Sequence, residues 1–322
     1  MRYVEVGGAR LSAIGLGTWQ FGSREWGYGD DYAEDEALKI TRRALDLGIN
    51  LIDTAEIYAF GRSERIVGRA IAGRRDEVFL ATKLLPVLPI SSVVPWRAVA
   101  SADRLGVETI DLYQLHGPNP AVPISSTMAG MARLQRTGLV RHVGVSNFSL
   151  ARWQAAERAL GGPVLSNQVQ YSLVCRGPEK DLVPFAQRND RLVIAYSPLA
   201  QGFLTAKYEG ARAPGGVRAG NSLFLPENMA RGSELLNTVR DVAKQHGASP
   251  AQIALAWLIH RPNVVAIPGA SSVAQLESNA AAADIELSAE EDHQLTAAAE
   301  RFVPLSGPAA MPGLIRARVR GR

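Results

Sequence analysis

Apolar residues recur along the chain in two alternating patterns. Short apolar runs, such as residues 110–116, are typical of strands that are buried on both faces. Between such runs, apolar residues are spaced three or four apart, as in the stripe of Ala37, Ile40, Ala44 and Leu47, which is typical of a helix with one buried face. The alternation is repeated along most of the chain and predicts strands separated by helices.

The pattern predicts eight strands, each followed by helical sequence. The expected strands cover residues 14–17, 51–53, 77–83, 110–116, 140–145, 164–168, 192–196 and 264–267. The expected helices cover residues 37–47, 63–72, 95–105, 126–136, 150–160, 181–188, 233–246, 251–260 and 272–282, with one more after Ser288. Buried strands joined by helices pair in parallel through right-handed crossovers. Eight such units fit an α/β fold of the (β/α)8 TIM-barrel type better than an open sheet.

The two ends of the chain add elements to this barrel. Residues 3–6 and 9–13 flank Gly7-Gly8 and predict an N-terminal β-hairpin, and additional helices follow the last strand. No linker divides the chain, so we expect residues 1–322 to form a single domain. Its last part, 302–322, is a basic tail that we interpret as solvated and mobile, because its arginines are not interleaved with aromatic residues that could stack on bases.

The composition narrows the class of protein. A net charge of +4, 47% hydrophobic residues and 20% charged residues are ordinary for a soluble globular protein. Cys175, the only cysteine, excludes an intramolecular disulfide and suits a reducing cytosol, so we expect a cytoplasmic protein. The longest apolar run, residues 251–259, is too short to cross a bilayer. We expect no membrane or nucleic-acid partner, no metal, and a monomer.

Polar residues stand where the expected strands end, which is the rim that carries the active site of such barrels. They are Asp53, Lys83, His116, Ser146, Asn147, Gln168, Tyr196 and Gly269. Each alone has an ordinary structural explanation, such as a helix cap or a solvated charge. Their joint occurrence at one rim predicts an active site.

Asp53, Tyr58, Lys83 and His116 suggest a specific chemistry. A tyrosine with a pKa near ~10 is a poor proton donor at neutral pH, and a neighbouring ammonium group, itself held by a carboxylate, lowers that pKa. A histidine can hold a substrate oxygen by a hydrogen bond. The set suits protonation of an oxygen while hydride reaches the attached carbon. Because no side chain supplies hydride, a nicotinamide cofactor is implied.

An ordered series of motifs across residues 4–302 resembles the aldo-keto reductase family. The motifs are Gly15-Leu16-Gly17-Thr18-Trp19, Asp53-Thr54-Ala55-Glu56-Ile57-Tyr58, Ala81-Thr82-Lys83, Asp111-Leu112-Tyr113-Gln114-Leu115-His116, Gly144-Val145-Ser146-Asn147-Phe148, Asn167-Gln168-Val169-Gln170-Tyr171-Ser172, Tyr196-Ser197-Pro198-Leu199-Ala200-Gln201-Gly202 and Ile267-Pro268-Gly269-Ala270. The resemblance implies a barrel that reduces aldehydes or ketones with NADP(H), a small-molecule carbonyl compound being the substrate.

The resemblance also implies roles for individual residues. The catalytic tetrad falls on Asp53, Tyr58, Lys83 and His116, with Tyr58 as the general acid. The residues expected to bind the cofactor are Thr18, Trp19, Asp53, Ser146, Asn147, Gln168, Tyr196, Ser197, Leu199, Gly202, Lys207, Arg218, Gly269, Ser271, Gln275 and Asn279. Residues 198–230, rich in glycine, proline and arginine, are expected to close over the cofactor. Aromatic residues on loops at the rim suggest a substrate pocket, and they are Trp19, Trp26, Tyr28 and Phe60.

The adenosine end of the expected cofactor site departs from many family members. Those members carry Lys or Arg where this chain has Ser271-Ser272, and the basic residue holds the 2′-phosphate of NADP. The helix expected to open at Ser271 presents N-terminal amides that suit a phosphate. We therefore expect NADP rather than NAD as the cofactor.

Two alternatives stay open on the sequence. The Gly17-Thr18-Trp19 motif, Ser271 and the long segment 198–230 also resemble the β subunits of voltage-gated potassium channels, which implies an NADP-binding regulatory subunit with slow or no turnover. The second alternative is a barrel lyase or isomerase that uses Lys83 as a Schiff-base amine.

Overall fold

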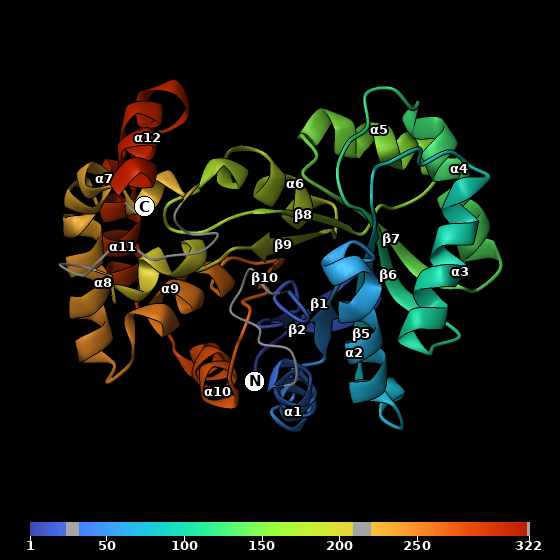
Figure 1. The fold of residues 1–322 in the computed structure, drawn as a ribbon, viewed down its shortest axis with the longest axis horizontal. Helices are drawn as coiled ribbons and strands as arrows, with labels where there is room; N and C mark the ends of the chain where they lie inside the picture. The colour runs from blue at the N-terminus through green and yellow to red at the C-terminus, as the bar shows by residue number, and fades with distance from the viewer. Residues whose placement is uncertain (24–31, 209–219, 321–322) are drawn as a thin grey trace.

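A parallel sheet of eight strands forms the centre of the molecule (Figure 1). The computed structural model describes residues 1–23, 32–208 and 220–320. The strands are β3 (Leu16–Gly17), β4 (Leu51–Asp53), β5 (Phe79–Leu84), β6 (Ile110–Leu115), β7 (Val140–Ser146), β8 (Ser166–Gln170), β9 (Leu192–Tyr196) and β10 (Val264–Ala266). They pair in chain order, and parallel bridges from Ile14 to Ala266 and from Gly17 to Gly269 join the first strand to the last. The expected (β/α)8 barrel is confirmed.

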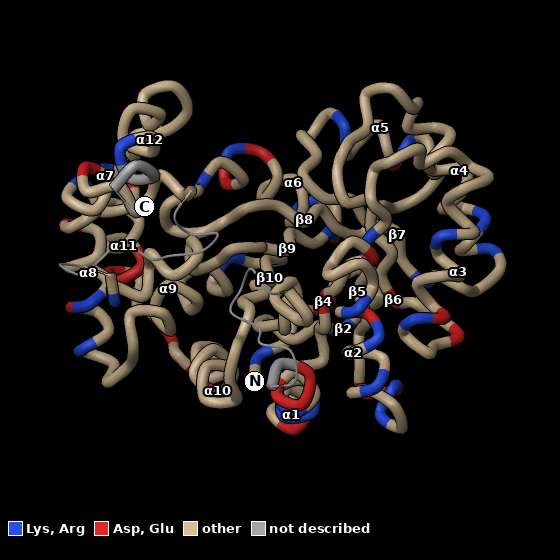
Figure 2. Tube along the Cα trace, in the orientation of Figure 1, with Lys and Arg blue, Asp and Glu red and all other residues tan. Residues whose placement is uncertain are grey.

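One helix follows each strand on the outside of the sheet. These helices are α1 (Tyr32–Asp46), α2 (Arg62–Ile71), α3 (Val93–Leu105), α4 (Ile124–Arg136), α5 (Leu150–Leu160), α6 (Leu182–Arg188), α9 (Pro250–Ile259) and α10 (Val273–Ala281). Charged residues lie mostly on the helices and loops of the chain, while the strands carry few (Figure 2). The short strands are almost wholly buried, which explains why they appear in the sequence as apolar runs rather than as alternating patterns.

Four further helices lie together at one end of the molecule (Figure 1). They are α7 (Pro226–Arg231), α8 (Ser233–Gln245), α11 (Ala289–Arg301) and α12 (Met311–Arg320). Of these, α11 and α12 follow the last strand, which confirms the additional C-terminal helices. Residues of the basic tail form α12, which follows the buried Ala310 and places Arg316 3.5 Å from Glu227. Within the described residues, no helix combines the length and apolarity needed to cross a membrane.

The N-terminal hairpin closes one end of the barrel. It consists of β1 (Tyr3–Val6) and β2 (Ala9–Ser12), paired antiparallel as expected. Val6, Ala9 and Leu11 pack in one apolar cluster with side chains from inside the barrel, including Leu51 and Leu165. With this end filled by apolar side chains, a polar site has room only at the opposite rim, where the strands end.

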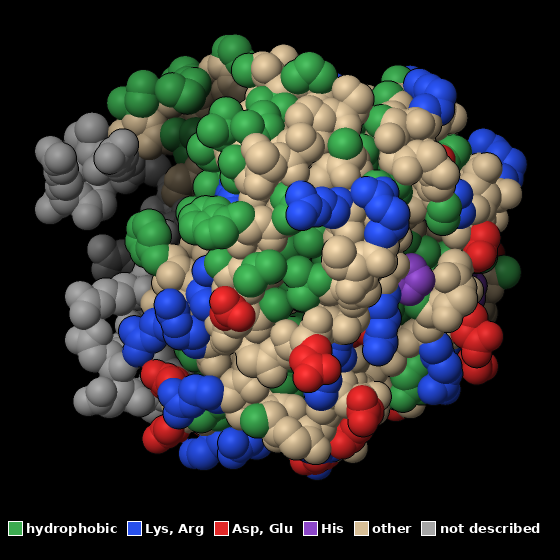
Figure 3. All heavy atoms as spheres, turned by 90° about the vertical axis from the view of Figure 1, so that its right-hand side faces the viewer, with side chains coloured by type: hydrophobic (Ala, Val, Ile, Leu, Met, Phe, Trp, Pro, Cys, Tyr) green, Lys and Arg blue, Asp and Glu red, His purple; other side chains and the backbone are tan. Residues whose placement is uncertain are grey.

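Exposed apolar side chains are concentrated near α3. Figure 3 views the molecule from the side of α3 to α5 and shows apolar side chains gathered along one edge of that face. Val87 and Leu88, which precede α3, and Trp96 and Val99, which lie on it, are all exposed. None of the four lines the cavity that contains the polar strand ends.

Candidate active site

A cavity of about 850 Å³ opens at the carboxyl ends of the strands and extends to the beginning of α10. Every described residue that was expected to bind the cofactor lines it: Thr18, Trp19, Asp53, Ser146, Asn147, Gln168, Tyr196, Ser197, Leu199, Gly202, Lys207, Gly269, Ser271, Gln275 and Asn279. Arg218 lies outside the described residues. Tyr58 and His116 of the expected tetrad line the same cavity. One elongated cavity thus contains both the acid–base residues and the positions expected to hold a dinucleotide.

The expected substrate pocket is described in part. Trp19 and Phe60 line the cavity and are 45% and 90% exposed, whereas Trp26 and Tyr28 lie outside the described residues. Ala59 and Phe60 have φ angles of 46° and 54°, a left-handed conformation that is unfavourable for residues with a Cβ atom. Such backbone strain is concentrated at functional sites. Here it occurs directly after Tyr58 and carries Phe60 to the cavity mouth.

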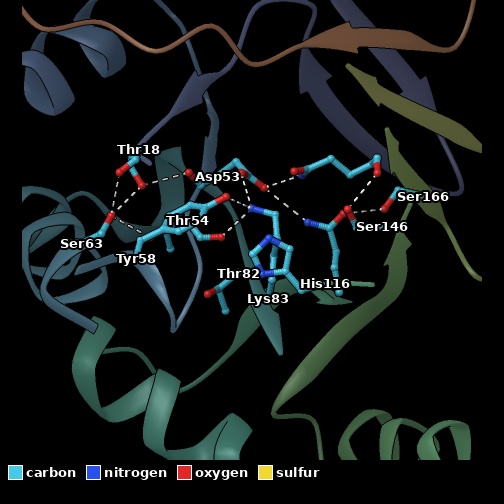
Figure 4. A network of polar contacts seen from close by, with 12 residues as sticks. Thr18, Asp53, Thr54, Tyr58, Ser63, Thr82, Lys83, His116, Ser146 and Ser166 are labelled. Carbon is cyan, nitrogen blue, oxygen red and sulfur yellow. Dashed lines mark hydrogen bonds and ion pairs between the residues drawn. The ribbon is translucent and has the colours of Figure 1, made fainter. Parts of the chain in front are cut away.

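Lys83 lies behind the cavity wall and is completely buried on β5. Its ammonium group donates to Asp53 Oδ2 at 2.5 Å, to the Thr54 carbonyl at 2.8 Å and to Tyr58 Oη at 3.2 Å. Figure 4 shows Lys83 pointing between Asp53 and Tyr58. All three ammonium hydrogens are therefore engaged. Because Lys83 neither lines the cavity nor has a free hydrogen, the geometry argues against the Schiff-base alternative.

Burial and charge act in opposite directions on the pKa values of Lys83 and Tyr58. Burial lowers the pKa of Lys83, but the charge of Asp53, the electrostatic interaction with Tyr58 and the hydrogen bonds to both outweigh burial, so its pKa lies above the ordinary value. For Tyr58, burial raises the pKa and exceeds the opposing effect of Lys83, so the net shift is upward. Lys83 therefore lowers the pKa of Tyr58 as expected, but removal of the phenol from water is the larger effect. Tyr58 is held as a protonated phenol.

His116 follows β6 and faces Tyr58, with the two ring centroids 5.8 Å apart in an edge-to-face arrangement. Burial, followed by the charge of Lys83, lowers the pKa of His116 to about 3. The imidazole is therefore neutral at physiological pH. Its Nδ1 atom is buried and has no hydrogen-bond partner in the described part of the chain. A neutral ring of this kind carries a single N–H, which suits a hydrogen bond to a carbonyl oxygen.

The residues expected to hold the nicotinamide carboxamide form one network. Ser146 Oγ donates to the Gln168 carbonyl at 2.8 Å, and Tyr196 Oη donates to Asn147 Oδ1 at 3.0 Å. Asn147 has a φ of 60°, a conformation that asparagine tolerates better than most residues. Gln168 Nε2 donates to Asp53 Oδ1 at 2.8 Å. The network thereby joins the expected cofactor positions to the carboxylate that holds Lys83.

Several residues of this network were not singled out from the sequence. Ser63 Oγ lies 2.9 Å from Thr18 Oγ1 and 3.0 Å from Thr54 Oγ1, and these hydroxyl groups tie the ends of β3 and β4 to the first turn of α2 (Figure 4). Gln114 Nε2 donates to Asp53 Oδ1 at 3.3 Å. The sequence pointed to a place for Gln114 in the site, because it lies two residues before His116 and alternate residues of a strand point to the same side.

The backbone N–H groups at the beginning of α10, which were expected to suit a phosphate, already donate hydrogen bonds to side chains. Gln275 Oε1 accepts from both the backbone N–H and the hydroxyl of Ser271, each at 2.9 Å. Glu36, from α1, accepts from the backbone N–H of Val273 at 3.2 Å, and Ser272 Oγ accepts from that of Gln275 at 3.2 Å. These three amides are therefore satisfied by side chains and are not open to a phosphate. Ser272 and Gln275 also do not form the reciprocal capping box that their spacing indicates, because the Gln275 side chain turns to Ser271.

No group of three or more His, Cys, Asp or Glu side chains within residues 1–23, 32–208 and 220–320 is arranged to hold a metal ion. The polar side chains that line the cavity are mostly amides and hydroxyls, together with Asp53, His116 and Lys207.

Residues 13–300 match the model of the aldo/keto reductase family, and the chain belongs to that family. An oxidoreductase of Mycobacterium tuberculosis is 55% identical over 323 residues, which cover 100% of both chains. A methylglyoxal reductase of Escherichia coli is 36% identical over 295 residues, 88% of this chain and 90% of that protein. A crystal structure of an aldo/keto reductase from Klebsiella pneumoniae, in complex with NADP and acetate, superposes with a TM-score of 0.74 at 34% identity and covers 91% of this chain and 93% of that one. The protein is accordingly an oxidoreductase of this family.

Proposed function

We propose that this chain reduces aldehydes or ketones to alcohols with NADPH, with Tyr58 as the general acid. The observation that carries the proposal is the position of Tyr58 Oη, which faces the cavity while a fully buried ammonium group lies 3.2 Å behind it. A phenol in this position can give its proton to an oxygen in the cavity. The ammonium group of Lys83 then stabilises the phenolate that forms.

The residues of the cavity fit a nicotinamide cofactor. The cavity is long, and amide and hydroxyl groups of Ser146, Asn147 and Gln168 gather at one end, while Ser271 and Asn279 line the other. A dinucleotide that spans these residues would supply hydride to the carbonyl carbon from its nicotinamide. We infer NADP rather than NAD because the related structure from Klebsiella pneumoniae holds NADP and because Lys207 lines this cavity.

The remaining residues orient the substrate and move one proton. The neutral His116 donates its N–H to the carbonyl oxygen, which fixes that oxygen beside Tyr58 Oη. Tyr58 passes its proton to the oxygen as negative charge develops there. Lys83 remains an ammonium group throughout, and Asp53 holds it in place through the 2.5 Å contact. In the reverse direction the phenolate of Tyr58 accepts the proton of an alcohol. No observation of the fold or of the site favours the regulatory-subunit alternative.

Replacement of Tyr58 by Phe tests the proposal. We expect kcat for NADPH-dependent reduction of a reactive aldehyde to fall by about 10²- to 10⁴-fold, the usual contribution of a positioned acid. The NADPH dissociation constant, read from quenching of tryptophan fluorescence, should not change. Tyr3→Phe is the matched control, because it removes a tyrosine hydroxyl that donates to the Gly48 carbonyl at the closed end of the barrel. Full activity of Tyr58→Phe would refute the mechanism.

A further inference from the structure

The second oxygen of the Asp53 carboxylate accepts a hydrogen bond from the side-chain amide of Gln114, a residue with no expected role in the site. Oδ2 binds Lys83, while Oδ1 accepts from Gln168 at 2.8 Å and from Gln114 at 3.3 Å. Gln114 lies on β6, directly beside Lys83 in the pairing of β5 and β6, and is completely buried. A buried amide is unfavourable unless both of its ends are hydrogen bonded.

Both ends of the Gln114 amide are satisfied inside the barrel. While Nε2 donates to Asp53, Oε1 accepts from Ser166 Oγ at 3.3 Å. Ser166 lies on β8, so this bond passes over β7, the strand between. At the crossing point β7 carries Gly144, where a Cβ atom would lie 2.4 Å from Ser166 Oγ and 2.8 Å from Gln114 Cγ. The glycine leaves the space in which the two side chains meet.

We propose that Gln114, anchored by Ser166, is a positioning residue that holds the Asp53 carboxylate in the orientation that ties Lys83 to Tyr58. The inference rests on the proposed function, since it gives Gln114 a part in the same proton transfer. A carboxylate bonded on only one oxygen can turn about its last bond. Two amide donors on Oδ1 oppose that rotation, keep Oδ2 on Lys83, and leave the third ammonium hydrogen directed at Tyr58. Gln114 itself does not line the cavity.

Kinetic constants of three variants test this role. Gln114→Met keeps the length of the side chain and removes both hydrogen bonds, and we expect kcat to fall by about 10- to 100-fold, as for the loss of a hydrogen bond to a charged group. The KM of the carbonyl substrate and the dissociation constant of NADPH should stay within about threefold. Ser166→Ala leaves Gln114 without its anchor and should lower kcat by less. Gln135→Met is the matched control, because Gln135 is a half-buried residue of α4, far from Asp53, that donates to the Arg141 carbonyl near the surface.

The ammonium group of Lys83 provides a second measurement that needs no turnover. The chain has five lysines, and Lys83 alone is buried, the other four being exposed. An ammonium group with three hydrogen bonds exchanges its hydrogens slowly, so its ¹⁵N-detected signal should persist in the unaltered protein and be assigned by its absence from Lys83→Arg. We expect Gln114→Met to weaken or abolish the signal and Gln135→Met to retain it.

The two measurements separate the possible failures. If Tyr58→Phe is fully active, the proposed function fails, but the Lys83 signal still tests the role of Gln114. If Gln114→Met retains both the Lys83 signal and the kcat of the unaltered protein, the role of Gln114 is refuted. Should Gln114→Met not fold, Ser166→Ala is judged by the same two measurements, and an unchanged signal with unchanged kcat again refutes it.

Discussion

Replacing Lys83 by Met removes the ammonium group from a carboxylate that is itself buried. The side chains of Lys83 and Asp53 are 0% and 2% exposed and lie 2.5 Å apart. Removing one member of such a pair leaves an uncompensated charge in the interior, which typically lowers the free energy of unfolding by about 3–5 kcal/mol. Asp53 would keep its amide donors, Gln114 and Gln168, so we expect the lower half of that range.

Urea unfolding followed by tryptophan fluorescence measures this loss. The double variant Asp53→Asn/Lys83→Met carries neither charge, and we expect it to regain at least about 1 kcal/mol of the loss, because the isolated carboxylate causes most of it. Lys244→Met is the matched control: Lys244 is exposed on α8 and pairs with Asp241 at 3.1 Å, and such surface pairs contribute less than about 1 kcal/mol. If the double variant were no more stable than Lys83→Met, the uncompensated charge would not be the cause of the loss.

Two further predictions concern protonation and the cofactor. The pKa of His116 is lowered to about 3 in the folded protein, below the unfolded value of about 6.5. Between these values the unfolded chain binds more protons than the folded one. The contribution of His116 to stability is therefore complete above pH 6.5 and is lost as the pH falls toward 3. His116→Asn should therefore flatten the dependence of unfolding free energy on pH between 6.5 and 3, and an unchanged slope would contradict the buried neutral ring. Ser271→Arg should tighten NADPH binding by about tenfold, through one added charge-assisted contact, and leave the NADH dissociation constant unchanged. An equal effect on both cofactors in fluorescence titrations would refute a 2′-phosphate contact.

The positions of the strands and most helices were predictable because burial leaves a direct trace in the order of residues. A strand covered on both faces must be apolar, and polar residues such as Asp53 and Lys83 stand out within or after such runs. The helix starts at Ser149, Ser249 and Ser288 were also predictable from neighbouring residues, since each serine side chain accepts a hydrogen bond from the backbone N–H three residues later. The spacing of Ser272 and Gln275 indicates a reciprocal capping box, but only the Ser272 half forms, because the Gln275 side chain binds Ser271, a partner that spacing alone does not exclude.

The sequence by itself determined the barrel, the family resemblance and the strand ends at which polar residues meet, because these depend on periodicity and on neighbours along the chain. Only the tertiary structure decided the balance of effects on Tyr58, where burial outweighs the charge of Lys83. It likewise decided that Glu36 caps the beginning of α10 from a position 237 residues away in the chain. It also brought Gln114 to Asp53 across the barrel interior. Such contacts depend on distances between side chains from separate strands and helices, and no local pattern contains those distances.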